Sequence, residues 1–143
     1  METYNQLKQR HREDVNNFPM VFAFSNKQFD EAMAKLGLTS DDTDKIYSLG
    51  GGGYMLKTDS KSFDEMFTRH NTELESAFKS DLTGEGFIFQ ALDYELGNHE
   101  YIITGDIGEA LGSLGLDEDD IAKSPAMIHG LRLALKKQRK MQA

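Results

Sequence analysis

Residues 29–38 read Phe-Asp-Glu-Ala-Met-Ala-Lys-Leu-Gly-Leu, and 78 positions later residues 107–116 read Ile-Gly-Glu-Ala-Leu-Gly-Ser-Leu-Gly-Leu. In both segments apolar residues recur at helical spacing, and a glycine followed by leucine ends the pattern. A short apolar run precedes each segment, at residues 22–24 and 101–103, and such runs are typical of strands. The chain therefore carries a strand-helix unit twice, through duplication or through chance recurrence of a common pattern.

The remaining elements follow from the same periodicities, with glycine and proline at their boundaries. Residues 20–24 form a continuously apolar run, which predicts a strand buried on both faces. Predicted helices cover residues 3–16, 26–36, 61–79, 87–96, 107–114 and the segment after Ser124-Pro125; predicted strands cover residues 20–24, 46–47, 54–57 and 101–103. We expect a helix-rich α+β fold, a single domain over residues 1–143, with a small sheet of about four short strands.

Charge is segregated along the chain. The net charge is −8, and all 24 acidic residues lie within residues 1–120. Residues 80–122 contain eleven carboxylates and no Lys or Arg, whereas residues 121–143 contain six bases and no acid. A field of this kind repels nucleic acid and attracts basic partners, so we expect a basic, nucleic-acid-binding protein as partner and no direct binding to nucleic acid.

The base-free stretch supplies the candidate partner-binding face. The local alternative is that acidic residues favour helix caps and first turns, which explains each acidic run but not the absence of bases. A divalent metal held by clustered carboxylates is a further alternative, although we predict no metal and no cofactor. The candidate residues of the acidic face are Asp93, Glu95, Glu100, Asp106, Glu109, Asp117, Glu118, Asp119 and Asp120.

A different class of function would use the glycine run Gly50, Gly51, Gly52 and Gly53 together with His99 and Glu100. Successive backbone N–H groups could bind an anion, which would make the protein a small-ligand or nucleotide-binding domain, with enzymatic activity as an open question. The run lacks the Lys-Ser/Thr of a phosphate loop and leads into a strand, so a hairpin loop is the simpler interpretation. We identify no catalytic residues and favour a non-enzymatic protein.

Residues 81–88 resemble the first part of a calcium-binding loop, with oxygen-bearing side chains at the first, third and fifth positions and glycine at the sixth. Leu92 occupies the position where a bidentate glutamate is required. An Asp- and Gly-rich connection between helices is therefore the favoured interpretation.

Four segments, residues 22–29, 50–54, 98–101 and 104–106, resemble a small acidic family of uncharacterised function found in phages and mobile elements of Firmicutes. The resemblance implies a context in which small acidic proteins often inhibit host defence, as anti-CRISPR proteins do. It implies no catalytic residues.

The amino terminus is polar, and no apolar run approaches the length of a membrane span. There are no cysteines, so nothing in the chain requires an oxidising compartment. We expect a cytoplasmic protein without a membrane partner, located in the host cytoplasm if phage-encoded.

Overall fold

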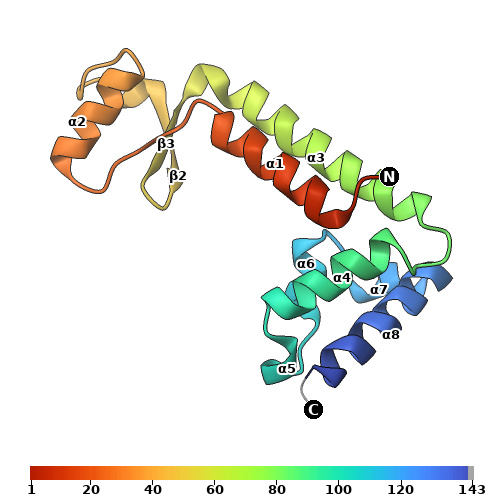
Figure 1. The fold of residues 1–143 in the computed structure, drawn as a ribbon. Coiled ribbons are helices and arrows are strands. Elements are labelled where there is room, and N and C mark those ends of the chain that lie inside the picture. The colour runs from red at the N-terminus through yellow and green to blue at the C-terminus, as the bar shows by residue number, and fades with distance from the viewer. Residues whose placement is uncertain (142–143) are drawn as a thin grey trace. The chain divides into compact units, whose positions relative to one another are not determined.

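The computed structural model describes residues 1–141 as a helix-rich α+β protein (Figure 1). Its elements are α1 (Tyr4–Asn17), β1 (Val21–Phe22), α2 (Asn26–Lys35), η1 (Thr43–Lys45), β2 (Ile46–Gly50), β3 (Gly53–Leu56), η2 (Lys57–Asp59), α3 (Ser60–Ser80), α4 (Phe87–Asn98), α5 (Tyr101–Thr104), α6 (Gly108–Ser113), α7 (Glu118–Ala122) and α8 (Pro125–Lys140).

The chain packs into two units, which we describe separately. The sheet unit comprises residues 12–69, and the helical unit comprises residues 1–11 with the described residues from 70 onward. Helices α1 and α3 each contribute residues to both units. The expectation of a single domain over residues 1–143 stays a prediction.

The sheet unit contains three antiparallel strands in the order β1-β3-β2. Val21 pairs with Tyr54, and the Tyr54 ring packs edge-on against Phe29 of α2, with ring centroids 5.4 Å apart. Helix α2 begins as predicted, because the Ser25 hydroxyl accepts a hydrogen bond from the Gln28 N–H. Figure 1 shows α2 beside this small sheet.

The first strand is buried on one side only. Ala23 is buried, whereas the side chains of Phe22 and Phe24 are 59% and 75% exposed. Successive strand residues point to opposite faces, so the apolar run presents Phe22 to solvent while Val21 faces the neighbouring Tyr54. The prediction of a strand buried on both faces is therefore wrong, because a three-stranded sheet with short edge strands does not cover its second face at this position.

The two Gly-Leu segments end their helices in the same way. Gly37 and Gly115 have φ values of +75° and +70°, a region that glycine adopts without steric cost. The Leu38 N–H donates to the Met33 carbonyl, and the Leu116 N–H donates to the Leu111 carbonyl, both at 2.9 Å. Each segment therefore closes with the same glycine cap, as its sequence predicts.

The strand predicted before the second segment does not form. Residues 101–104 are the helical turn α5, which follows α4 after the single left-handed residue Glu100, at φ 56°. The Gly105 N–H donates to the Tyr101 carbonyl at 2.7 Å, which satisfies the backbone locally rather than in a sheet. The sheet thus has three strands instead of about four, and the duplicated strand-helix unit is not confirmed.

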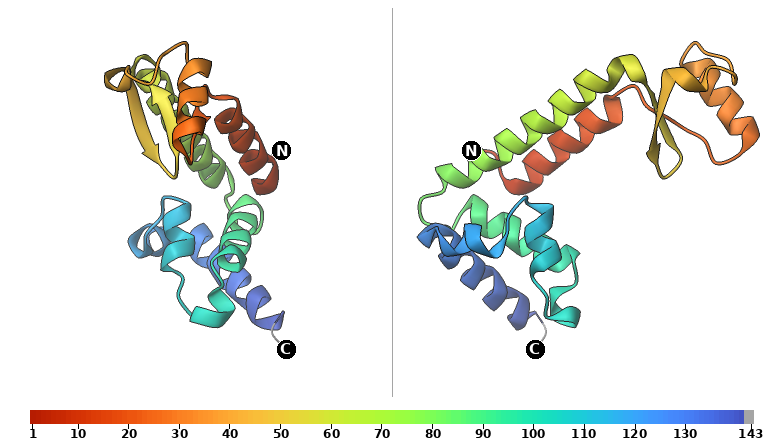
Figure 2. Two further views of the ribbon diagram at one scale, coloured as in Figure 1. Left: turned by 90° about the vertical axis from the view of Figure 1, so that its left-hand side faces the viewer. Right: turned by 180° about the vertical axis from the view of Figure 1, so that it is seen from behind.

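The core of the helical unit lies between α4, α6 and α8, and both views in Figure 2 show α8 running next to α4. Close approach of the 81–86 connection to α8 depends on two glycines. A Cβ atom added at Gly84 would lie 1.9 Å from the Ala126 carbonyl oxygen, and one added at Gly130 would lie 2.7 Å from the Gly84 carbonyl oxygen. The backbone of the connection therefore packs directly on the backbone of α8.

Candidate interaction site

The acidic run at residues 117–120 forms the cap and first turn of α7. The Asp120 N–H donates to the Asp117 carboxylate at 2.8 Å, and the Asp117 N–H donates to the Asp120 carboxylate at 3.0 Å. The Asp120 N–H lowers the pKa of the Asp117 carboxyl group. Capping of α7 thus accounts for the presence of Asp117 and Asp120, two of the four acidic residues in this run. Glu118 and Asp119 are exposed and make no ion pair with any Lys or Arg of the described chain.

Most of the predicted acidic face lies on the surface of the helical unit. Asp93 is partly buried and Glu95 is buried, whereas the other seven candidates are exposed. The exposed set is Glu100, Asp106, Glu109, Asp117, Glu118, Asp119 and Asp120.

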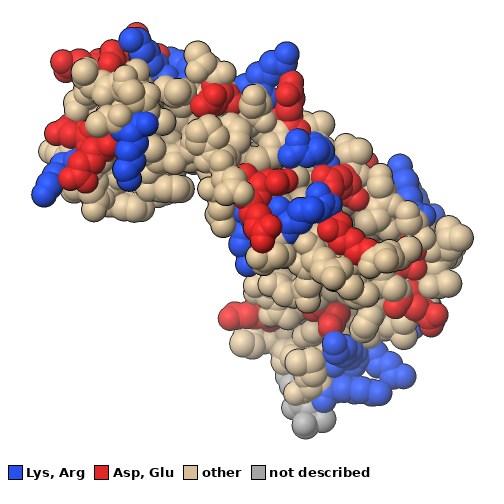
Figure 3. Space-filling model, turned by 45° about the horizontal axis from the view of Figure 1, so that its top comes forward, with Lys and Arg blue, Asp and Glu red and all other residues tan. Residues whose placement is uncertain are grey.

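Asp93 is used internally, where α4 meets the basic helix α8. Its carboxylate accepts hydrogen bonds from Lys137 Nζ and Gln138 Nε2, both at 2.8 Å. Arg139 donates to the Tyr101 hydroxyl at 3.3 Å. Figure 3 shows Lys and Arg side chains gathered beside the last described residues, and the last turn of α8 carries Lys137, Arg139 and Lys140. Cations are favoured at this end of a helix, so the basic segment has a structural role.

Glu95 does not belong to the acidic face, because its side chain is only 1% exposed. It accepts hydrogen bonds from Lys8 Nζ at 2.6 Å, from the Tyr4 hydroxyl at 2.9 Å and from the Ser113 hydroxyl at 3.2 Å. Burial of a carboxylate is costly unless it is paired and hydrogen-bonded, and here three donors from α1 and α6 satisfy it. The carboxylate therefore joins α1 and α6 to α4.

The surroundings of Glu95 resemble a catalytic cluster in composition. Burial and the neighbouring Glu95 charge raise the pKa of the Tyr4 hydroxyl, and His99 Nε2 lies 3.9 Å from the carboxylate. Glu95 does not line the cavity described below, and all the donors around its carboxylate come from side chains that hold α1 and α6 against α4. We therefore interpret the cluster as structural. Sequence reasoning missed Tyr4, Lys8 and Ser113 because nothing in the sequence pairs Lys8 with a residue 87 positions away.

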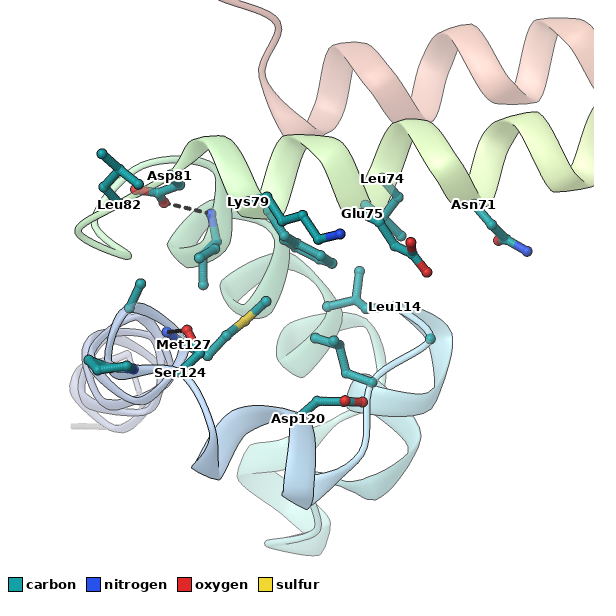
Figure 4. A pocket seen from close by; sticks show the side chains of 16 residues that line it. Asn71, Leu74, Glu75, Lys79, Asp81, Leu82, Leu114, Asp120, Ser124 and Met127 are labelled. Carbon is teal, nitrogen blue, oxygen red and sulfur yellow. Dashed lines mark hydrogen bonds between the residues drawn. The ribbon is translucent and has the colours of Figure 1, made fainter.

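A cavity of about 790 Å³ opens in the helical unit between α3, the 81–82 connection and the start of α8 (Figure 4). Apolar side chains form much of its lining, including Leu74, Phe78, Leu114 and Met127. The polar lining residues include Glu75, Lys79 and Asp120. Asp120 belongs to the acidic turn, so the cavity and the acidic face are continuous.

Asp81 holds the connection that forms one side of the cavity. Its carboxylate accepts hydrogen bonds from the N–H groups of Gly84, Gly86 and Ile88 at 3.0 to 3.1 Å. Burial opposes ionisation of Asp81, but these N–H donors outweigh it and lower the pKa of the carboxyl group. The arrangement is that of an Asp- and Gly-rich helix connection, the interpretation that the sequence favours over a calcium loop.

The glycine run forms the β2–β3 hairpin turn in the sheet unit. Gly50, Gly51 and Gly52 have φ values between +57° and +82°, and the Gly52 carbonyl accepts a hydrogen bond from the Ala23 N–H at 2.9 Å. His99 and Glu100 belong to the helical unit. The Nδ1 atom of His99 lies 3.5 Å from a carboxylate oxygen of Glu109. A ligand site that joins the glycine run to these two residues stays a prediction.

Within residues 1–141, no three His, Asp or Glu side chains are grouped in a way that could hold a metal ion. No helix of that same region is long and apolar enough to cross a membrane.

These features define a helix-rich α+β protein whose candidate site is an acidic surface beside an apolar cavity. The chain belongs to DUF7659, a family of unknown function, whose model matches residues 3–137. No curated protein matches the chain, and no solved structure does. The origin in phages or Firmicutes that the sequence motifs suggest stays a prediction.

Proposed function

We propose that this protein is a non-enzymatic interaction protein that binds a basic, nucleic-acid-binding partner through the seven exposed carboxylates of the helical unit. In the form that the sequence motifs suggest, the partner is a host defence protein such as a CRISPR effector, and binding inhibits it. The acidic residues would occupy the basic groove that otherwise holds nucleic acid.

The observation that carries the proposal is that Glu118 and Asp119 are exposed and have no ion-pair partner within the described residues. Some acids of the chain have an internal ion-pair partner, as Asp93 has Lys137 and Asp14 has Arg69. Glu118 and Asp119 are exposed, and no Lys or Arg within residues 1–141 lies within ion-pair distance of them. Charges left without an internal partner are available to a basic surface, where they mainly increase the association rate and the specificity.

The test uses the double variant Glu118→Lys/Asp119→Lys, which leaves the capping residues Asp117 and Asp120 in place. Binding of purified CRISPR effectors to labelled DNA is followed by fluorescence anisotropy with and without this protein. We expect the wild type to displace DNA from at least one effector, with an affinity that falls about tenfold between low and moderate salt. The double variant should lose this displacement.

The matched control is Glu31→Lys/Asp44→Lys, which makes the same change in net charge at exposed positions of the sheet unit. It should displace DNA nearly as well as the wild type. Equal displacement by both double variants would exclude the acidic face as the binding surface. No displacement from any effector, combined with salt-sensitive binding to polylysine, would exclude the anti-defence role while keeping the acidic face.

A further inference from the structure

We infer that the cavity of the helical unit binds the apolar side chains of a basic amphipathic helix presented by the partner. This inference rests on the proposed function and deepens it, because it names the kind of segment that the acidic face would recognise. Acidic residues would set the orientation and the cavity would supply the apolar anchor.

The size and lining of the cavity suit apolar side chains. Its volume of about 790 Å³ lies within the range of ligand-binding cavities in general. Phe78, Leu114 and Met127 are almost fully buried and line it, while Leu74 and Leu116 add half-buried aliphatic surface. A helix that inserts two or three apolar side chains at helical spacing is a common occupant of such a groove.

The charges around the cavity select a basic occupant. Glu75 on α3 and Asp120 on α7 are exposed lining residues, and Figure 4 shows both carboxylates near Leu114. Lys79 is the one cationic side chain among the described lining residues. Beyond Asp120, the exposed Glu118 and Asp119 continue the negative charge. Lysine or arginine residues flanking an apolar anchor would therefore meet carboxylates.

Leu82 at the edge of the cavity supports an apolar contact there. Its side chain is 87% exposed, and it lies in the connection that the Asp81 carboxylate fixes through three backbone N–H groups. A single exposed leucine needs no explanation on its own. Held in a fixed connection beside an apolar cavity, however, Leu82 adds apolar surface where an amphipathic helix would lie.

The experiment uses three fluorescein-labelled synthetic peptides, each of about four helical turns. The first places leucine on one face and lysine on the other, the second replaces every leucine by serine, and the third replaces every lysine by glutamate. Anisotropy measures affinity, and methyl NMR of Leu114 and Met127 reports on the cavity. We expect the Leu/Lys peptide to bind at least about tenfold more tightly than either other peptide and to shift both methyl signals.

Two variants test the site. Leu82→Asp should remove most of the advantage of the Leu/Lys peptide over the Ser/Lys peptide, and Glu75→Lys should weaken binding of both lysine peptides. Ile103→Asp is the matched control, because Ile103 is 79% exposed on α5 and does not line the cavity. It should leave all affinities unchanged. Circular dichroism confirms that each variant folds.

The outcomes separate this inference from the proposed function. Equal, salt-sensitive binding of the Leu/Lys and Ser/Lys peptides would overturn the apolar anchor and leave the acidic face intact. Equal binding of the Leu/Lys and Leu/Glu peptides would overturn the selection of a basic occupant. Absence of binding by the Leu/Lys peptide would overturn the inference as a whole, while displacement of DNA from an effector would still support the proposed function.

Discussion

At the scale of single residues, Glu95 shows how a charged side chain can serve the fold rather than the surface. Lys8 and Tyr4 come from α1 and Ser113 from α6, and all three donate to one buried carboxylate of α4. Such a pair contributes little net stability compared with apolar side chains of the same volume. Removing one member, however, leaves the other charge buried and unpaired.

We therefore predict that Lys8→Met destabilises the protein by about 3 kcal/mol, because the Glu95 carboxylate loses its cationic partner. Glu95→Gln should cost less, since the amide oxygen still accepts a hydrogen bond from the Tyr4 hydroxyl and the amide NH2 can donate to the Ser113 hydroxyl oxygen. The double variant Lys8→Met/Glu95→Gln should be more stable than Lys8→Met alone. Urea unfolding of the four proteins gives the coupling free energy.

Additive effects of the two substitutions would contradict this prediction, because they would mean that Lys8 and Glu95 do not interact. Glu118→Gln is a suitable control, since this exposed acid lies outside the cluster and should change the unfolding free energy by less than about 0.5 kcal/mol.

At the scale of elements, the packing of the 81–86 connection on α8 depends on the absence of a side chain at Gly84. A Cβ atom there would lie 1.9 Å from the Ala126 carbonyl oxygen, and the residue also has a φ of +85°. We predict that Gly84→Ala lowers the unfolding free energy by more than about 3 kcal/mol or prevents folding, because backbone rather than a flexible side chain must move.

Gly51→Ala provides the matched comparison. Gly51 also has a positive φ, of +57°, but a Cβ atom at that position would meet nothing within 4 Å. Its substitution should cost about 1 kcal/mol through backbone strain alone. Thermal unfolding of both variants measures the difference, and similar losses for the two glycines would show that close packing at Gly84 is unimportant.

Elements with strong local signals could be predicted from the sequence. Ser25 caps α2, Ser124-Pro125 begins α8, and the Gly37 and Gly115 caps lie where expected, because each depends on residues within one turn. The segment from Tyr101 to Ile103 was predicted as a strand from its apolar and β-branched side chains. So short an apolar run has no decisive periodicity, so the sequence does not distinguish a strand from a helix. The structure forms a helical turn there.

The candidate site was predictable only in part. Local composition identified the acidic run at residues 117–120, and its exposure agrees with that prediction. Local composition does not indicate whether a side chain is buried, so the sequence places Glu95 on the surface. In the structure Glu95 is buried between α4, α1 and α6 and accepts hydrogen bonds from α1 and α6. The cavity also escaped prediction, because Glu75 on α3, Leu114 at the end of α6 and Met127 on α8 converge on it from three separate elements.

At the scale of the whole molecule, the excess of acidic groups determines how stability depends on pH. The net charge of −8 creates self-repulsion at neutral pH. Against this, hydrogen bonds and ion pairs in the folded state lower the pKa values of Glu2, Glu73 and Asp81 below their ordinary range. A carboxyl group whose folded pKa is lowered stabilises the fold above its unfolded pKa and loses that contribution as the pH falls through its folded pKa.

We therefore predict that the urea midpoint changes little between pH 7 and pH 5 and falls steeply below about pH 4, where these carboxyl groups take up protons in the unfolded state before they do so in the folded state. Asp81→Asn identifies one source of this loss. At pH 7 the variant should be less stable by about 1 to 3 kcal/mol, because asparagine keeps one acceptor oxygen and its NH2 group leaves at least one of the three backbone N–H groups without an acceptor. Its deficit relative to the wild type should be smaller at pH 3, because a carboxyl group whose folded pKa is lowered contributes less stability once the pH falls below its unfolded pKa. A deficit that is the same at both pH values would mean that Asp81 holds the 81–86 connection through its shape alone and that its charge contributes nothing.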